Sequence, residues 1–88
     1  MPKNWVTSYQ PEFLEDLEYF VKTNSRTALK VIGLMKEIRR DPFTGTGQPE
    51  YLKYLPGNTW SRRITQEHRL VYRVDEGLID FLQTRYHY

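Results

Sequence analysis

Apolar residues recur at helical spacing in the segment that follows Pro11. The repeat has five members: Phe13, Leu14, Leu17, Phe20 and Val21. Acidic residues fill most of the positions between them. Pro11 suits the first turn of a helix, and Glu12 favours the positive end of the helix dipole. The pattern predicts a surface helix with one buried stripe and an acidic outer face.

A second helical repeat follows the segment Thr23-Asn24-Ser25, whose short polar side chains are suited to capping. Its apolar members are Ala28, Val31, Ile32, Met35 and Ile38. Asp41-Pro42 ends the pattern, because the residue before a proline is pushed out of helical geometry. Two helices joined by so short a turn are expected to form an antiparallel hairpin, with their stripes packed as ordinary core.

The remaining apolar residues lie in short segments rich in β-branched and aromatic residues, separated by turn-forming residues. These segments predict strands at residues 3–7, 60–65, 69–74 and 78–85, and a strand or mixed segment at 50–55. The expected order is β-α-α-β-β-β-β. We therefore predict an α+β fold, in which a small, twisted, mostly antiparallel sheet is covered on one face by the N-terminal helical hairpin. Residues 1–88 are expected to form a single domain, since the chain is too short for two cores.

The predicted hairpin of residues 60–74 carries arginines at positions 62, 63, 69 and 73, with Glu67 as the only nearby acid. If Arg63 lies opposite Arg69, both side chains share a face, whereas a register shifted by one residue separates them. Like charges side by side cost stability, so a shared face suggests an anionic ligand. A solvated basic face is the alternative. Together with the neighbouring residues, the pair favours a phosphate-binding surface.

Charge along the chain supports an anionic partner. Lys and Arg outnumber Asp and Glu by 8 to 4 in residues 36–73, against 4 to 4 in residues 1–35 and 1 to 3 in residues 74–88. The surplus therefore surrounds the arginine hairpin, which indicates a local partner such as nucleic acid. Aromatic residues make up 15% of the chain and can serve either a core or stacked bases.

Composition excludes several other classes of protein. The chain has no cysteine, so it has neither disulfides nor thiolate metal sites. Two histidines and scattered acids show no metal-ligand spacing, and no cofactor is expected. No signal peptide or membrane-spanning run is apparent, so a cytoplasmic location without membrane contact is expected.

The chain contains the groups needed to cut RNA through its own 2′-hydroxyl without a metal ion. Such cleavage needs a base, cations to stabilise the phosphorane and an acid for the leaving 5′-oxygen. Glu50, on a loop edge after a proline, could be the base. His87, which titrates near neutrality, could be the acid. Lys53, Arg63 and Arg69 could hold the phosphate.

Each of these assignments is weak when taken alone. An isolated glutamate is usually solvated, and a histidine near a terminus is more often disordered than catalytic. His68 lies at the predicted turn, where a structural or solvent-facing role is expected.

Several segments together resemble a known family. They are Asp41-Pro42-Phe43 with Gly45 and Gly47, Pro49-Glu50 with Lys53, Trp60-Ser61-Arg62-Arg63-Ile64-Thr65, Glu67-His68-Arg69-Leu70-Val71-Tyr72 and Arg85-Tyr86-His87-Tyr88. They are similar to the YoeB/Txe family of bacterial toxins, within the RelE-like group of ribosome-dependent mRNA endonucleases. The resemblance spans nearly the whole chain. It is less close in the N-terminal helical region.

The resemblance implies a small twisted sheet with a helical hairpin on one side. It implies cleavage of mRNA in the A site of the 70S ribosome, leaving a 2′,3′-cyclic phosphate and a 5′-hydroxyl. Glu50 resembles the general base, His87 the general acid and Arg69 the transition-state stabiliser. Lys53 and Arg63 would be further phosphate contacts, and Tyr88 would lie at the edge of the active site.

The resemblance also implies partners. A YefM/Axe-like antitoxin is expected to wrap the toxin and disturb its C-terminal residues, and the complex to bind its own operator DNA. A homodimer is expected as well. Two other functions stay open from the residues: a module that binds RNA without cutting it, and a toxin of the same fold that inhibits a protein such as DNA gyrase.

Overall fold

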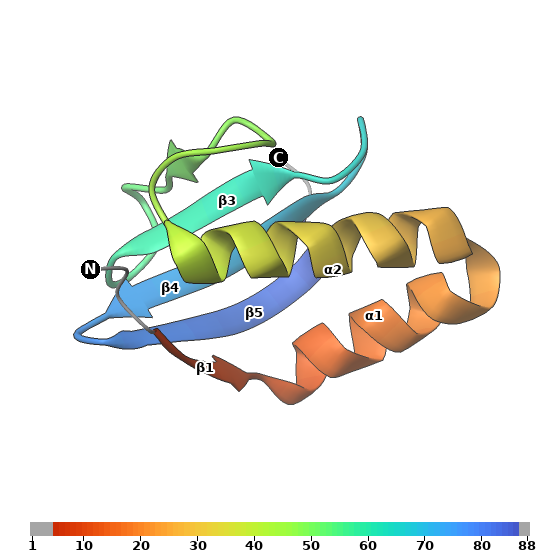
Figure 1. Ribbon diagram of the computed structural model, residues 1–88, viewed down its shortest axis with the longest axis horizontal. Coiled ribbons are helices and arrows are strands. Elements are labelled where there is room, and N and C mark those ends of the chain that lie inside the picture. The colour runs from red at the N-terminus through yellow and green to blue at the C-terminus, as the bar shows by residue number, and fades with distance from the viewer. Residues whose placement is uncertain (1–4, 87–88) are drawn as a thin grey trace.

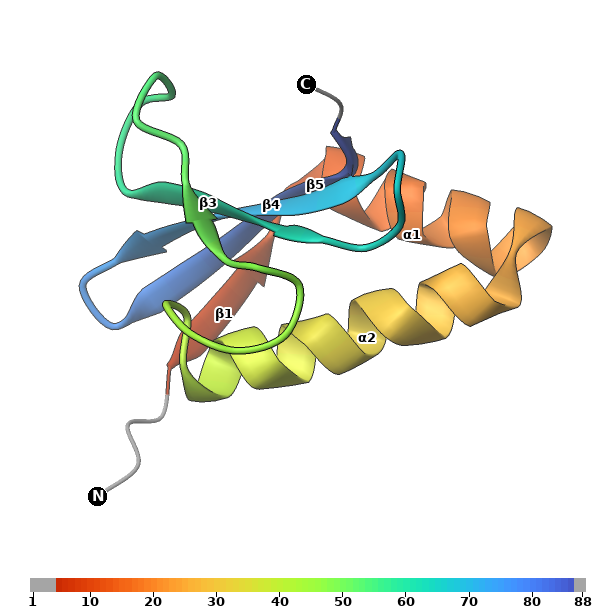
Figure 2. The same cartoon turned by 90° about the horizontal axis from the view of Figure 1, so that it is seen from above.

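Five strands form one twisted sheet, and two helices lie against one of its faces (Figures 1 and 2). The computed structural model describes residues 5–86. In chain order the elements are β1 (Val6–Tyr9), α1 (Pro11–Thr23), α2 (Ser25–Arg40), β2 (Glu50–Tyr51), β3 (Thr59–Arg63), β4 (Arg69–Asp75) and β5 (Leu78–Tyr86). The strand order across the sheet is β1-β5-β4-β3-β2. Only β1 and β5 are parallel, so the predicted α+β fold with a mostly antiparallel sheet is confirmed.

The helix boundaries follow the predicted start and stop signals. α1 begins at Pro11, and Asn24 caps α2 by accepting a hydrogen bond at Oδ1 from the backbone N–H of Thr27, at 3.3 Å. α2 ends at Arg40, immediately before Asp41-Pro42. No helix in the described part of the chain is long and apolar enough to span a membrane.

The core lies between the helices and the sheet, and the helices meet it with a narrower stripe than predicted. Phe13 and Phe20 of α1 are buried there, together with the α2 residues Ala28, Val31, Leu34 and Ile38. The prediction was wrong for Leu14, Val21 and Ile32, which are exposed. Each of these residues follows a buried or partly buried one by a single position, which rotates it out of the contact by about 100°.

Two strands differ from the prediction. The first lies at Val6–Tyr9, later than the expected residues 3–7, and residues 1–4 lie outside the described part of the chain. In the predicted segment 50–55, only Glu50 and Tyr51 form a strand. The chain turns directly afterwards, because the Leu55 N–H bonds back to the Leu52 carbonyl at 3.1 Å and Pro56 follows.

The ladder between β4 and β5 contains two register shifts. Tyr72 pairs with Phe81, Val71 with Gln83 and Arg69 with Tyr86. β5 therefore uses two more residues than β4 over this stretch, as β-bulges require. A regular ladder would have placed Thr84 opposite Arg69. The shifts bring Tyr86 to that position instead.

Candidate active site

The sheet gathers three of the predicted site residues on the face turned away from the helices. Arg63 lies opposite Arg69, which confirms the register that puts both arginines on one face. Ser61, two residues before Arg63, shares that face and pairs with Glu50 of β2. Glu50, Arg63 and Arg69 are therefore grouped around Ser61, although they come from three different strands.

Arg69 is held firmly within this group. Its Nε donates to the Ser61 hydroxyl oxygen at 2.8 Å, and its Nη2 donates to the backbone carbonyl of Gln48 at 3.3 Å. The residue is only 7% exposed. Because a guanidinium always carries its charge, Arg69 is a fixed cation bound to Ser61, the residue that pairs with Glu50.

Arg63, which lies opposite this fixed arginine, and Lys53 are exposed cations. Arg63 is anchored through its backbone, since its N–H donates to the Gly47 carbonyl at 2.7 Å. Lys53 lies in the turn that follows β2, three residues after Glu50. Both side chains project into solvent, where a phosphate could be bound.

Arg62 does not belong to the basic surface, contrary to the interpretation of the hairpin as carrying four surface arginines. Side chains alternate along β3, so Arg62 points to the helix side of the sheet, and it is fully buried. Its Nη2 donates to the carbonyls of Asp41 and Thr44, at 2.7 and 2.8 Å. Its Nη1 donates to the carbonyl of Thr46 at 3.3 Å, and its Nε to the Tyr72 hydroxyl at 3.2 Å.

These contacts fix the loop of residues 41–49, which leads from α2 to Glu50. Tyr72 adds a bond from its hydroxyl to the Pro42 carbonyl at 2.6 Å, and burial raises the pKa of this phenol. Gly47 has a φ of 87°, and a Cβ there would approach the Arg63 carbonyl to 2.9 Å. The loop therefore packs so closely against β3 that only glycine fits at this position.

Two carboxylates stabilise the same loop by accepting hydrogen bonds. Asp41 accepts from the Thr44 hydroxyl and the Phe43 N–H, and these bonds lower its pKa. Glu37 accepts from the Thr46 N–H, which likewise lowers the pKa of Glu37. Hydrogen bonds to the ionised form explain both shifts, and the nearby Arg62 guanidinium adds to them.

The contribution of these two carboxylates to the stability of the fold is therefore expected to fall as the solution becomes acidic. A carboxyl whose folded-state pKa is lowered contributes stability above its unfolded-state pKa of about 4, and this is lost as pH falls through the folded-state pKa. Asp41→Asn should unfold more easily in urea at pH 7, and its stability should depend less on pH between about 5 and 2. Glu15→Gln, on the exposed face of α1, is the control. Equal pH dependence for wild type and Asp41→Asn would contradict this role.

His87 and Tyr88 lie outside the described residues. The described part of β5 ends at Tyr86, whose backbone is paired with Arg69. The sequence thus continues into His87 directly from a residue in register with the fixed arginine.

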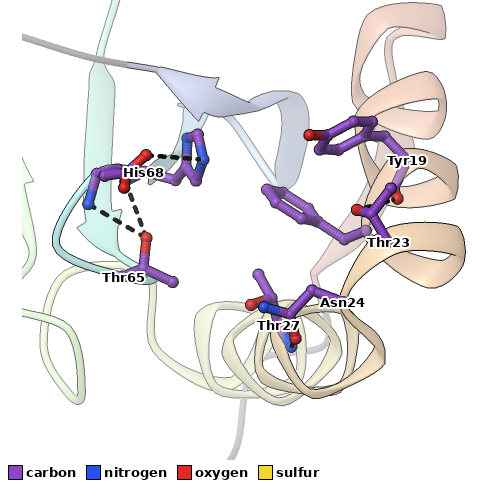
Figure 3. Close-up of a pocket in the computed structure, with 8 residues that line it drawn as sticks. Tyr19, Thr23, Asn24, Thr27, Thr65 and His68 are labelled. Atoms are coloured by element: carbon purple, nitrogen blue, oxygen red, sulfur yellow. Dashed lines mark hydrogen bonds and ion pairs between the residues drawn. The ribbon is translucent and has the colours of Figure 1, made fainter.

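His68 has the structural role that its turn position suggested. Its side chain is 16% exposed and packs edge-on against the Phe20 ring, with centroids 5.3 Å apart. It borders a cleft of about 360 Å³ between the helical turn and the β3–β4 turn (Figure 3). The other residues that line the cleft are Tyr19, Phe20, Thr23, Asn24, Thr27, Thr65 and Glu67. None of the predicted site residues that lie within residues 5–86 lines it.

Arg73, the fourth arginine of the hairpin, contacts an acid of β5. Its Nη2 lies 3.5 Å from Asp80 Oδ2, and Asp80 also accepts from Ser8 and Gln10. Arg73 lies four residues along β4 from Arg69, which corresponds to about 13 Å at the rise of a strand. In residues 5–86 no cluster of three or more acidic or histidine side chains could hold a metal ion.

Two residues of the site were not predicted from the sequence. Ser61 occurs in the sequence pattern only as part of a motif, and Gln48 is not among the predicted site residues. The alternation of β3 could have placed Ser61 beside Arg63, but its contact with Arg69 depends on a side-chain conformation. Nothing in the sequence signals the backbone geometry of Gln48.

Comparisons with known proteins agree with this fold and motif pattern. Residues 9–88 match the family described as YoeB-like toxin of bacterial type II toxin–antitoxin system. The chain is 44% identical over 80 residues to Toxin YoeB of Escherichia coli K12, covering 91% of this chain and 95% of that protein. It is 42% identical over 81 residues to Toxin RelK of Mycobacterium tuberculosis, covering 92% and 95%.

Solved structures give the same result. The YoeB/ParE toxin from Agrobacterium tumefaciens superposes with a TM-score of 0.86 at 38% identity, covering 94% of this chain and 99% of that one. A YoeB dimer from Staphylococcus aureus has a TM-score of 0.86 at 39% identity, with 97% and 99% covered. A YoeB–YefM complex from the same organism gives 0.82 at 39%, with 96% and 98% covered. This chain therefore belongs to the YoeB-like toxins of bacterial type II toxin–antitoxin systems.

Proposed function

We propose that this toxin is an endoribonuclease that cuts mRNA in the A site of the translating ribosome. The observation that carries the proposal is the convergence of Glu50 and Arg69 on Ser61 from different strands. A carboxylate beside a fixed guanidinium is the pair that attack by a 2′-hydroxyl on its own phosphate requires. Membership of the YoeB-like toxins supports the same activity.

In the proposed reaction Glu50 takes the proton of the 2′-hydroxyl, and the 2′-oxygen attacks the adjacent phosphorus. Arg69 stabilises the negative charge that builds up on the phosphorane, with Lys53 and Arg63 as further phosphate contacts. The bond to the 5′-oxygen breaks, and that oxygen takes a proton from His87. The products are a 2′,3′-cyclic phosphate and a 5′-hydroxyl, with no metal ion or cofactor required. Tyr88 contacts substrate at the edge of the site.

The proposal includes partners. A YefM/Axe-like antitoxin holds the toxin inactive, and their complex represses its own operon by binding operator DNA. The toxin forms a homodimer and acts in the cytoplasm. The antitoxin and the homodimer are supported by the Staphylococcus aureus relatives, which were solved as a YoeB–YefM complex and as a YoeB dimer.

The decisive experiment adds purified protein to a translating extract and maps the 5′ ends of the message. Wild-type protein is expected to produce discrete 5′-hydroxyl ends at A-site codons, only on translated message. A Glu50→Ala, His87→Ala double variant, checked for folding by circular dichroism, is expected to produce none.

Other outcomes separate the competing functions. Cleavage of naked RNA at an equal rate would support the proposed chemistry and show that cleavage does not depend on the ribosome. Tight RNA binding without new ends, unchanged in Glu50→Ala, would support a binding module. Intact message and unaffected translation would contradict the nuclease, and inhibition of DNA gyrase would then be measured.

A further inference from the structure

The guanidinium of Arg69 is fixed on two sides before any ligand is present. Ser61 Oγ accepts from its Nε at 2.8 Å, and the Gln48 carbonyl accepts from its Nη2 at 3.3 Å. These two acceptors use different nitrogens of the planar group, so together they restrict both its position and its rotation. A surface arginine would instead lose side-chain freedom when it binds a phosphate.

Ser61 occupies the position from which both proposed catalytic groups can be aligned. It is fully buried in β3, with Glu50 opposite on one side and Val71 opposite on the other. Its backbone therefore sets the register of the strand that begins with Glu50, while its hydroxyl holds Arg69. Ser61 thus combines a backbone pairing with Glu50 and a side-chain hydrogen bond to Arg69.

The second acceptor comes from a strained residue. In residues 5–86, Gln48 is the only residue other than glycine with a positive φ, at 50°. Such a conformation is unfavourable for a residue with a side chain and persists only where the surroundings enforce it. Those surroundings are the backbone bond of Arg63 to Gly47 and the loop contacts of Arg62. The strain orients the Gln48 carbonyl toward Arg69.

We propose that Ser61 is a positioning residue that fixes Arg69 in its catalytic orientation, with the Gln48 carbonyl as the second contact. This inference rests on the proposed nuclease function. A cation that is already fixed where negative charge develops needs no reorganisation during the reaction. Loss of the Ser61 contact should therefore lower the rate of the chemical step. Ribosome binding depends on exposed charges and is expected to be unaffected.

Ser61→Ala is the direct test, measured as single-turnover cleavage on programmed ribosomes. Loss of a hydrogen bond to a charged group is expected to slow cleavage by about ten-fold or more, with ribosome affinity within about two-fold of wild type. Ser61→Thr, which keeps a hydroxyl on the same carbon, should recover most of the rate. A Ser61→Ala variant that cuts at the wild-type rate would overturn the proposal.

Thr59→Val provides a matched control. Thr59 is two residues away on the same face of β3, is 1% exposed, and donates its hydroxyl proton to the Pro56 carbonyl at 2.7 Å. Thr59→Val therefore also removes a buried hydroxyl from β3 but leaves Arg69 untouched. It should lower stability and keep the cleavage rate. An equal loss of rate in both variants would show that Ser61 acts only through general stability.

A second measurement separates this inference from the proposed function. The Nε–H of Arg69 in the free protein should exchange slowly with solvent by NMR, and much faster in Ser61→Ala. If the wild-type protein cuts no message, but its Arg69 Nε–H is protected and the protection is lost in Ser61→Ala, the nuclease function is wrong and the fixation of Arg69 by Ser61 is supported. Equal exchange in both proteins would overturn the fixation itself.

Discussion

Replacing Arg62 by methionine is expected to lower the free energy of unfolding by about 3 kcal/mol or more. Methionine fills much of the space but leaves the carbonyls of Asp41, Thr44 and Thr46 without the donors that the arginine supplied. The lost hydrogen bonds are partly buried and come from a charged donor, so each one costs about 1 kcal/mol or more. Urea unfolding at pH 7 measures the change, which is a large share of the typical stability of a small domain.

The neighbouring arginine provides the control for this variant. Arg63→Met changes the same residue type one position along β3, but its side chain is exposed. Its effect on stability should stay within about 0.5 kcal/mol. Equal destabilisation by the two substitutions would mean that Arg62 does not hold the loop. Arg62→Lys should also be destabilised, because an ammonium cannot reproduce the fork of donors.

Replacing Arg69 by glutamine is expected to slow cleavage of ribosome-bound message by about 10²- to 10³-fold. Glutamine retains polar atoms but lacks the charge that stabilises the phosphorane. The loss should appear in the single-turnover rate more than in ribosome binding, because the charge matters most in the transition state. Quench-flow cleavage and a ribosome-binding titration measure the two quantities separately.

Arg73→Gln is the matched control for this variant. Arg73 lies on the same face of β4 and contacts Asp80 at the far end of the strand. It should cut at nearly the wild-type rate. If Arg69→Gln weakened ribosome binding and left the cleavage rate unchanged, Arg69 would be a docking residue and the proposed mechanism would be wrong.

Local signals in the sequence predicted the hairpin but left its register open. A polar break between two β-rich runs locates the turn, and alternation puts Arg63 and Arg69 on a shared face once the structure shows them opposite each other. The helix boundaries were predicted for the same reason, since Pro11, Asn24 and Asp41-Pro42 act on adjacent residues. These features depend on short-range geometry.

The burial of Arg62 could not be predicted in this way. Arginine in a strand is usually exposed, and its burial here depends on carbonyls supplied by a loop 16 to 21 residues earlier in the chain. The positive φ of Gln48 likewise results from long-range contacts with β3. The exposed Leu14, Val21 and Ile32 show the complementary error, because periodicity predicts a stripe but not its width.

The fixation of Arg69 has a consequence for how activity is lost on heating. Its acceptors belong to the middle of β3 and to a loop tied to that strand, and neither lies in a frayed end of the sheet. Local fluctuations that open the chain termini would therefore leave this part of the site intact. The position of Arg69 should be kept as long as the sheet is folded. On heating, its contacts should therefore be lost together with global unfolding and not in an earlier local transition.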